Sequence, residues 1–366
     1  MYVYDRAMEH CVNISDQNLT SLVGVKGIED ATILLCYNNR LTSLEGCPFG
    51  VTHLICSNNQ LVSLEGCPPG VTSLTCNGNR LTSLAGCSQV VSTLVCYDNQ
   101  LTSLDGCPRS VTTLNCDNNK LTSLDGCPRA VVTLNCSRNK IVSFVGLQNH
   151  SITILNCNDN DLTSLIGCPK NVVTLNCYGN KLTSLVGCSM SVKYFSGSGN
   201  RLTSLEGCPN DSLLNCSYNH LPSLVGCSKK VTVLYCNHNR LTSLNGCSPR
   251  VKVLYCSNNY LTSLAGCPRS ILHIRCADNP LEQICSRDRS LTLREIAALA
   301  VRNASSLFRV DAWNDPATLP RELADYINDA TTMGLCDVCR LRYGATCEVY
   351  KVCGQDIPVW KCDKCH

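Results

Sequence analysis

A repeat of twenty residues constrains this chain more than any other feature. The unit Val-x-x-Leu-x-Cys-x-x-Asn-x-Leu-Thr-Ser-Leu-x-Gly-Cys-Pro-x-x recurs with small changes over about residues 12–283. One unit gains a residue within 149–161 and another loses one within 210–220. A unit this short cannot bury an apolar face by itself, so neighbouring units must stack and share one core. The sequence therefore predicts a solenoid.

The motif resembles the leucine-rich repeat, whose core is Leu-x-x-Leu-x-Leu-x-x-Asn-x-Leu, with Cys in the third leucine position. This resemblance implies a β-rich solenoid, a leucine-rich repeat with a parallel β-sheet on the concave face. The outer side of each coil contains Gly-Cys-Pro, and its Gly and Pro disfavour a helix. We expect extended or tight-turn backbone there.

One asparagine in each unit marks thirteen coils. We expect its amide to bond backbone groups of its own coil and of the neighbouring coil, because those groups would otherwise be buried without partners. Ile14, Gln17 and Leu19 fit a degenerate first coil, as a terminal cap requires. The asparagines are Asn39, Asn59, Asn79, Asn99, Asn119, Asn139, Asn160, Asn180, Asn200, Asn219, Asn239, Asn259 and Asn279.

Cysteine supplies 31 of the 366 residues, and most cysteines fall in two columns of the repeat. One column lies in the expected strand and the other follows the glycine, so we expect each coil to bury two thiols. Gly197 and Leu147 fill vacant places in these columns, which indicates a need for apolar bulk and not for sulfur chemistry. Side chains of one column point in parallel directions, which disfavours disulfides between neighbours.

Several features predict a cytoplasmic or nuclear protein with no membrane segment. The first residues lack the apolar region of a signal peptide, and no run of eighteen apolar residues occurs. The glycosylation motifs at Asn135 and Asn215 lie in expected strands, where glycans would crowd the concave face.

Charge and composition argue against several functions. Lys and Arg exceed Asp and Glu by 31 − 28 = 3, so no strong field favours nucleic acid or a membrane. The seven histidines are scattered and no glycine-rich phosphate loop follows a strand. We therefore expect a protein that is not an enzyme.

The C-terminal third of the concave face is the candidate surface for a protein partner, because it gathers residue types that are enriched in interface anchors. The alternative is that its tyrosines only shield neighbouring strands. Basic residues often follow the asparagine, as at Arg40, Arg80 and Lys120, and we interpret this row as a solvated face. The candidate residues are Tyr194, Val233, Tyr235, Val253, Tyr255, His273 and Arg275.

After the repeats, residues 284–330 predict two helices that form a C-terminal helical cap. Their motifs resemble the SOCS box, found in substrate receptors of cullin-based ubiquitin ligases. The resemblance implies that Leu293, Ala297 and Val301 bind the elongin B/C adaptor, and that a Leu-Pro-x-x-Leu segment selects a cullin. In that segment the matching residues are Leu319, Pro320 and Leu323. Ala297 departs from the more usual Cys, and the alternative is a cap with no ligase link.

Residues 331–366 contain two Cys-x-x-Cys pairs, which predict a small zinc-binding module. The four thiols would hold one structural Zn²⁺ and leave no position for an activated water. The expected ligands are Cys336, Cys339, Cys362 and Cys365, with Cys347, Cys353 and His366 as possible replacements.

The sequence thus divides into an N-terminal cap with a degenerate repeat (1–30), a solenoid (31–283), a helical segment (284–330) and a zinc module (331–366). We interpret the chain as a protein-recognition solenoid and a candidate substrate receptor of an elongin/cullin-type ubiquitin ligase. The alternatives are an interaction scaffold with no ligase link and, less favoured, zinc-dependent nucleic-acid binding.

Overall fold

The computed structural model describes residues 10–210, 212–281, 345–352 and 355–362. Contacts divide the chain into two compact units. The first unit is Met1–Leu182 with Val186–Phe195, and the second unit is Thr183–Leu185 with Ser196–His366. The expected helical segment at 284–330 lies outside the described residues, as does most of the expected zinc module.

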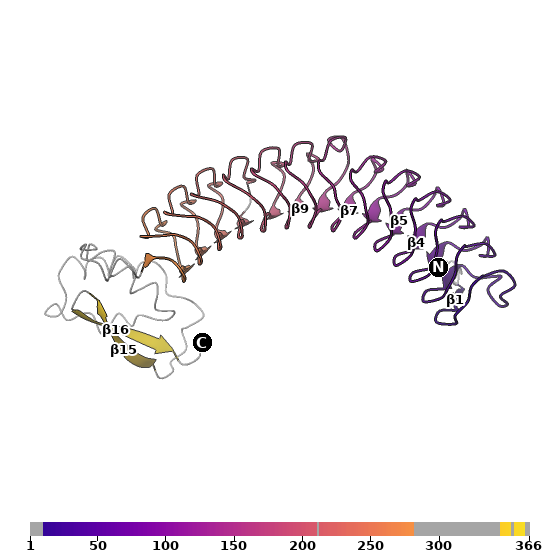
Figure 1. Ribbon diagram of the computed structural model, residues 1–366, viewed down its shortest axis with the longest axis horizontal. Coiled ribbons are helices and arrows are strands. Elements are labelled where there is room, and N and C mark those ends of the chain that lie inside the picture. The colour runs from indigo at the N-terminus through magenta and orange to yellow at the C-terminus, as the bar shows by residue number, and fades with distance from the viewer. Residues whose placement is uncertain (1–9, 211, 282–344, 353–354, 363–366) are drawn as a thin grey trace, which may run out of the picture. The chain divides into compact units, whose positions relative to one another are not determined.

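Short parallel strands build the first unit, one in each coil, and they pair in chain order. Within each unit the strands line the concave side of the coils, which we call the strand face (Figure 1). The parallel sheet that the repeat predicts is confirmed. The strands are β1 (Cys11–Asn13), β2 (Ile33–Leu35), β3 (His53–Ile55), β4 (Ser73–Thr75), β5 (Thr93–Val95), β6 (Thr113–Asn115), β7 (Thr133–Asn135), β8 (Ile154–Asn156) and β9 (Thr174–Asn176).

The second unit continues the same pattern with four strands that pair in parallel, and β10 (Tyr194–Ser196) falls at the division between the units. The strands of the second unit are β11 (Leu213–Asn215), β12 (Val233–Tyr235), β13 (Val253–Tyr255) and β14 (His273–Arg275). Near the C-terminus, β15 (Ala345–Val352) and β16 (Gln355–Cys362) form an antiparallel hairpin.

The core of most coils consists of one Val, three Leu and one Cys at fixed positions. In the coil of β6 these are Val111, Leu114, Cys116, Leu121 and Leu124, none more than 3% exposed. Side chains alternate along a strand, so the middle residue of each strand points inward and its two neighbours stay on the strand face. The apolar column therefore runs from coil to coil as a continuous core.

The repeated asparagine joins adjacent coils. Asn119 donates through Nδ2 to the carbonyls of Cys116 in its own coil and Cys96 in the preceding coil, at 3.1 Å each. Its Oδ1 accepts the amide of Leu101 at 2.9 Å. The expected role of the asparagines is thus confirmed, since one side chain satisfies buried backbone groups of two coils.

Two tight turns form the outer side of a coil, as expected. The Cys67 amide donates to the Leu64 carbonyl at 3.0 Å, and the Val71 amide donates to the Pro68 carbonyl at 3.2 Å. Gly66 between them has a φ of +84°, and a Cβ there would lie 2.6 Å from the backbone nitrogen of Glu45 in the preceding coil. This position requires glycine for both its backbone conformation and its close approach.

The degenerate first coil is also present in the structure. Strand β1 pairs with β2, and the Asn39 side chain donates to the Ile14 carbonyl at 2.8 Å. Ile14 and Leu22 are buried beneath it. Residues 10–30 therefore cover one end of the first unit's core.

The two cysteine columns differ in burial, which corrects the expectation of two buried thiols in every coil. The strand column is buried throughout, with free thiols at Cys36, Cys56, Cys76, Cys96, Cys116, Cys136, Cys157, Cys216 and Cys236. The second column is mixed: it is buried at Cys87, Cys127, Cys168, Cys188 and Cys208 and half-buried at Cys47, Cys67, Cys107, Cys227, Cys247 and Cys267. This column lies in the outer turn, where solvent reaches one side of the half-buried thiols.

No helix within the described segments has both the length and the apolar character needed to cross a membrane.

Candidate protein-binding face

The strand face of the second unit presents aromatic and cationic side chains in register. Strands β12 and β13 pair so that Tyr235 lies opposite Tyr255, and β13 and β14 pair so that Tyr255 lies opposite Arg275. A parallel ladder without stagger places the same coil position of successive strands side by side. Side chains at one position therefore meet along the solenoid.

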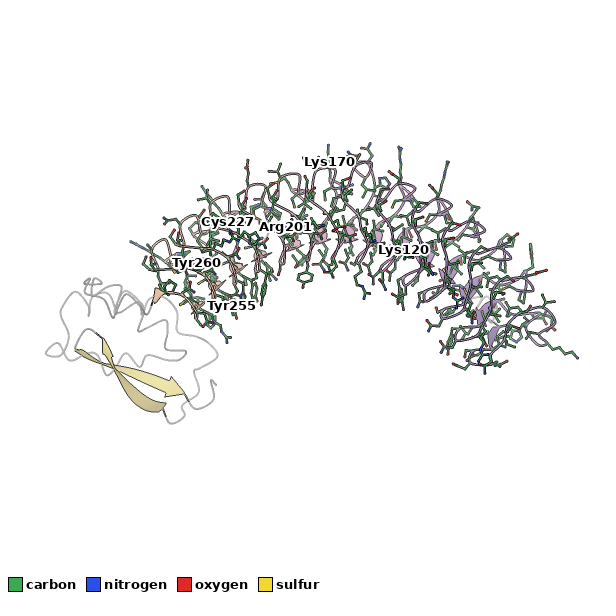
Figure 2. All side chains as sticks on the ribbon, viewed as in Figure 1. Lys120, Lys170, Arg201, Cys227, Tyr255 and Tyr260 are labelled. Carbon is green, nitrogen blue, oxygen red and sulfur yellow. The ribbon has the colours of Figure 1, made fainter. Side chains whose placement is uncertain are left out.

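Four of these side chains form a cluster around Tyr255. The rings of Tyr235 and Tyr255 lie 4.8 Å apart at an interplanar angle of 8°. The His273 ring lies 5.7 Å from that of Tyr255 at 56°, and the Arg275 guanidinium stands 5.7 Å over the Tyr255 ring. We call Tyr235, Tyr255, His273 and Arg275 the ring patch; Figure 2 shows Tyr255 projecting from the strand-bearing side.

The electrostatics of the ring patch come from Arg275. Burial lowers the pKa of His273, and the charge of Arg275 lowers it further. The imidazole is therefore mainly uncharged at neutral pH, because its ordinary pKa is already about 6.5. Arg275 is the fixed positive charge of the patch.

The remaining predicted partner residues have different positions. Val233 and Val253 lie half-buried on β12 and β13, two residues before the stacked tyrosines, so the structure brings them beside the ring patch. Tyr194 is 65% exposed on β10 and belongs to the first unit. Six of the seven predicted residues therefore share one surface of the second unit.

A second aromatic pair was missed in the sequence. Tyr218 and His238 stack with ring centroids 4.2 Å apart at an angle of 11°. Both have left-handed backbone conformations, with φ of 55° and 51°. Most coils place Asn, Asp or Gly at this position, since these residues adopt positive φ at little cost. The aromatic residues at a position suited to Asn or Gly were the signal that could have identified this pair.

The strand face of the first unit differs, because its polar side chains bond their own chain. The Oδ1 atom of Asn135 accepts the Ser137 amide at 3.2 Å and the Ser137 hydroxyl at 2.8 Å. Asn115 accepts the Asp117 amide in the same way at 3.2 Å. These two side chains stabilise the turn after their strands.

The basic row behaves as a solvated face. Its members Arg40, Arg80, Lys120, Lys140, Lys181, Arg201 and Arg240 are exposed. Lys181 pairs with Asp161 at 2.7 Å, and Lys120 donates to Gln100 at 3.2 Å. On the opposite, convex side, Lys170 points away from the coil (Figure 2).

The buried thiols are poor nucleophiles. Burial raises the pKa of Cys36 and Cys96 to about 12, so both stay protonated at neutral pH. The thiolate is the reactive form of cysteine. A hollow on the convex side is lined by Cys107, Cys127 and their turn residues, and burial likewise raises the pKa of Cys127 to about 12.

The expected adaptor and metal sites fall almost wholly outside the described residues. This applies to Leu293, Ala297, Val301, Leu319, Pro320 and Leu323, and to Cys336, Cys339 and Cys365. Cys362 is the last residue of β16, where its backbone pairs with Ala345. Among the described residues, no three His, Cys, Asp or Glu side chains gather in a way that could hold a metal ion.

Comparison with solved structures identifies the fold. The chain is similar to YopM from Yersinia enterocolitica, with 24% identity and a TM-score of 0.55, over 68% of this chain and 60% of that one. It is similar to YopM from Yersinia pestis, described as a leucine-rich effector protein, with 24% identity and a TM-score of 0.59, over 75% and 84%. A chain of the LRIM1/APL1C complex matches at 17% identity and a TM-score of 0.55, over 74% and 61%.

These likenesses show that the chain has the leucine-rich repeat fold. The match spans less than two thirds of the Y. enterocolitica protein. No protein-family model and no curated protein matches the sequence.

Proposed function

We propose that this chain is a protein-recognition module that binds its partner on the strand face of the second unit. The observation that carries the proposal is the ring patch, in which the strand register sets stacked tyrosines and an arginine side by side. Tyr and Arg are enriched among residues that dominate binding energy, and preordered side chains lose little entropy on binding. The LRIM1/APL1C complex is an instance of a protein of this fold in a complex with another protein.

The proposal is tested with a Tyr235→Ala and Tyr255→Ala double variant of the full chain. Proteins captured by the wild type are crosslinked and identified, and capture is compared with a Tyr97→Ala and Tyr178→Ala control, whose tyrosines follow strands of the first unit. We expect the first variant alone to lose the partner while its thermal unfolding shows a folded protein. Equal capture by both variants would place the binding surface elsewhere.

We further propose that the chain is a substrate receptor of an elongin/cullin-type ubiquitin ligase. The support is the SOCS-box-like order of Leu293, Ala297 and Val301 followed by Leu319, Pro320 and Leu323. The tail also resembles that of the animal leucine-rich-repeat-containing protein fifty-eight. Co-purification with elongin B/C is expected for the wild type and not for a Leu293→Asp, Leu319→Ala, Pro320→Ala variant. No adaptor recovered with the wild type would leave a plain interaction scaffold.

The C-terminal module is proposed to hold one structural zinc through Cys336, Cys339, Cys362 and Cys365. The hairpin supports this, because its register sets Ala345 beside Cys362, and in the sequence one Cys-x-x-Cys pair precedes Ala345 while the other begins at Cys362. Elemental analysis is expected to give one zinc per chain, lost in Cys336→Ser but retained in a Cys11→Ser control. A folded hairpin in zinc-free protein would contradict the proposal.

A further inference from the structure

Within the second unit, residues 212–277 carry a one-sided charge that the whole chain conceals. Residues 212–277 contain seven Lys or Arg and no Asp or Glu. Residues 10–195 of the first unit contain eleven of each kind, so their formal charge is zero. The coils of β11 to β14 therefore create a positive potential that attracts anions.

Several of these charges border the strand face. Arg275 lies on β14 and is exposed, and exposed Lys252 directly precedes β13. Arg240 is exposed in the turn that follows β12. The nearest acidic residue in sequence is Asp278, three residues after Arg275. The ring patch thus lies among more positive than negative groups.

The stack also limits what the tyrosines can offer a ligand. Tyr235 and Tyr255 cover a face of each other, and the Arg275 guanidinium stands over Tyr255. Tyr255 therefore offers a ligand its ring edge and its hydroxyl group, which are electropositive or can donate a hydrogen bond. Such a surface suits carboxylates. It suits nucleic-acid bases less well, because bases stack on free ring faces.

We infer that the ring patch, with Lys252 and Arg240, binds an acidic, extended peptide segment of a protein partner. The inference rests on the proposed function and adds the chemistry of the partner. Carboxylates would accept hydrogen bonds from the tyrosine hydroxyls and pair with Arg275, whose planar group can bond both oxygens of a carboxylate. The peptide backbone would lie along the row of half-buried residues at Val233 and Val253.

The test is a selection from a random twelve-residue peptide library displayed on phage, with the full chain as bait. Peptides that bind the wild type but not the Tyr235→Ala, Tyr255→Ala variant are expected to be strongly enriched in Asp and Glu. For a chosen peptide, fluorescence anisotropy should show binding about tenfold weaker with Lys252→Gln, Arg275→Gln, a loss typical of an interface anchor. The control Arg80→Gln, Lys120→Gln removes equal charge from the first unit and should leave binding nearly unchanged.

The outcomes separate the two proposals. Tyrosine-dependent peptides without acidic enrichment would overturn this inference and leave protein recognition standing. Selection of no tyrosine-dependent peptide would overturn both. A labelled single-stranded DNA of twelve nucleotides that binds more tightly than the selected peptides, and loses binding in the tyrosine variant, would identify nucleic acid as the ligand and overturn the inference.

Discussion

The first and second units share an interior but differ on the surface. In both, a Val, Leu and Cys core is joined by an asparagine that bonds two coils, as at Asn139 and Asn239. On the strand face, the first unit has Asn and Thr side chains, whereas the second has stacked rings, in a stretch (212–277) with basic but no acidic residues. The repeat therefore determines which residues are buried, whereas the residues of the strand face can differ from coil to coil.

The largest expected effect is a loss of stability in both units at alkaline pH. In the unfolded chain a thiol titrates near its ordinary value of 9.0, whereas burial raises the pKa of Cys36 and Cys96 to about 12. Above pH 9 the unfolded chain releases protons that the folded chain retains, so stability falls until the folded pKa is reached. Each such thiol lowers the free energy of unfolding by about 1.4 kcal/mol for each pH unit between the two pKa values.

Urea unfolding between pH 8 and pH 11 under reducing conditions measures this effect. A Cys36→Val, Cys96→Val variant should have a shallower dependence on pH than the wild type. A stability that stays level across this range would mean that the thiols are already accessible in the folded protein.

Asparagine replacements test whether the interiors are equivalent. Asn139→Ala leaves the amide of Leu121 without its partner and removes one of the two asparagine donors from the carbonyls of Cys116 and Cys136. Asn239→Ala does the same to the Leu221 amide and to the carbonyls of Cys216 and Cys236. We expect each to reduce the free energy of unfolding by about 2 kcal/mol, since a buried unsatisfied group costs about 1 to 3 kcal/mol. Chemical denaturation of both variants, with the strand-face variant Asn135→Ala as control, measures the two losses of stability. A large difference between them would show that the interiors of the two units are not equivalent.

Removal of one stacked ring should have a smaller effect. Tyr255→Ala removes the ring contacts with Tyr235 and the cation–π contact with Arg275, which together contribute about 1 to 2 kcal/mol. Tyr255→Phe, measured alongside, keeps the stack and should retain most of the stability. If the Phe variant lost as much stability as the Ala variant, the hydroxyl and not the stack would stabilise the strand face.

The smallest effect is expected for the ion pair of the first unit. Arg138 donates to the carboxylate of Asp117, which raises the pKa of Arg138, but its side chain is largely solvent-exposed. Exposed pairs contribute about 0 to 1 kcal/mol, so Arg138→Gln should shift the urea midpoint only slightly and less at high salt. A loss of stability comparable to that of Asn139→Ala would show that this surface ion pair stabilises the first unit as much as a buried asparagine does.

The fold could be predicted from the sequence because the apolar positions of the repeat mark the side chains that are buried in each coil. The positions of Val, Leu, Cys and Asn recur in most coils since each occupies the same environment, and this regularity was sufficient to assign strand face, core and turns. The ring patch was located by residue type, but its stacking depended on the exact register between strands. The left-handed pair Tyr218 and His238 was not predicted, because these residues lie after the strands and not on them. The partial exposure of six thiols in the second cysteine column depended on turn geometry, which the pattern does not encode.

The unstaggered alignment of Tyr235 with Tyr255 has a consequence for how this molecule can diversify. Duplication of a single coil would copy a complete row of surface groups and set it in contact with its parent, about 4.8 Å farther along the sheet. Each inserted coil would lengthen the surface available to a binding partner, while the buried residues would stay the same.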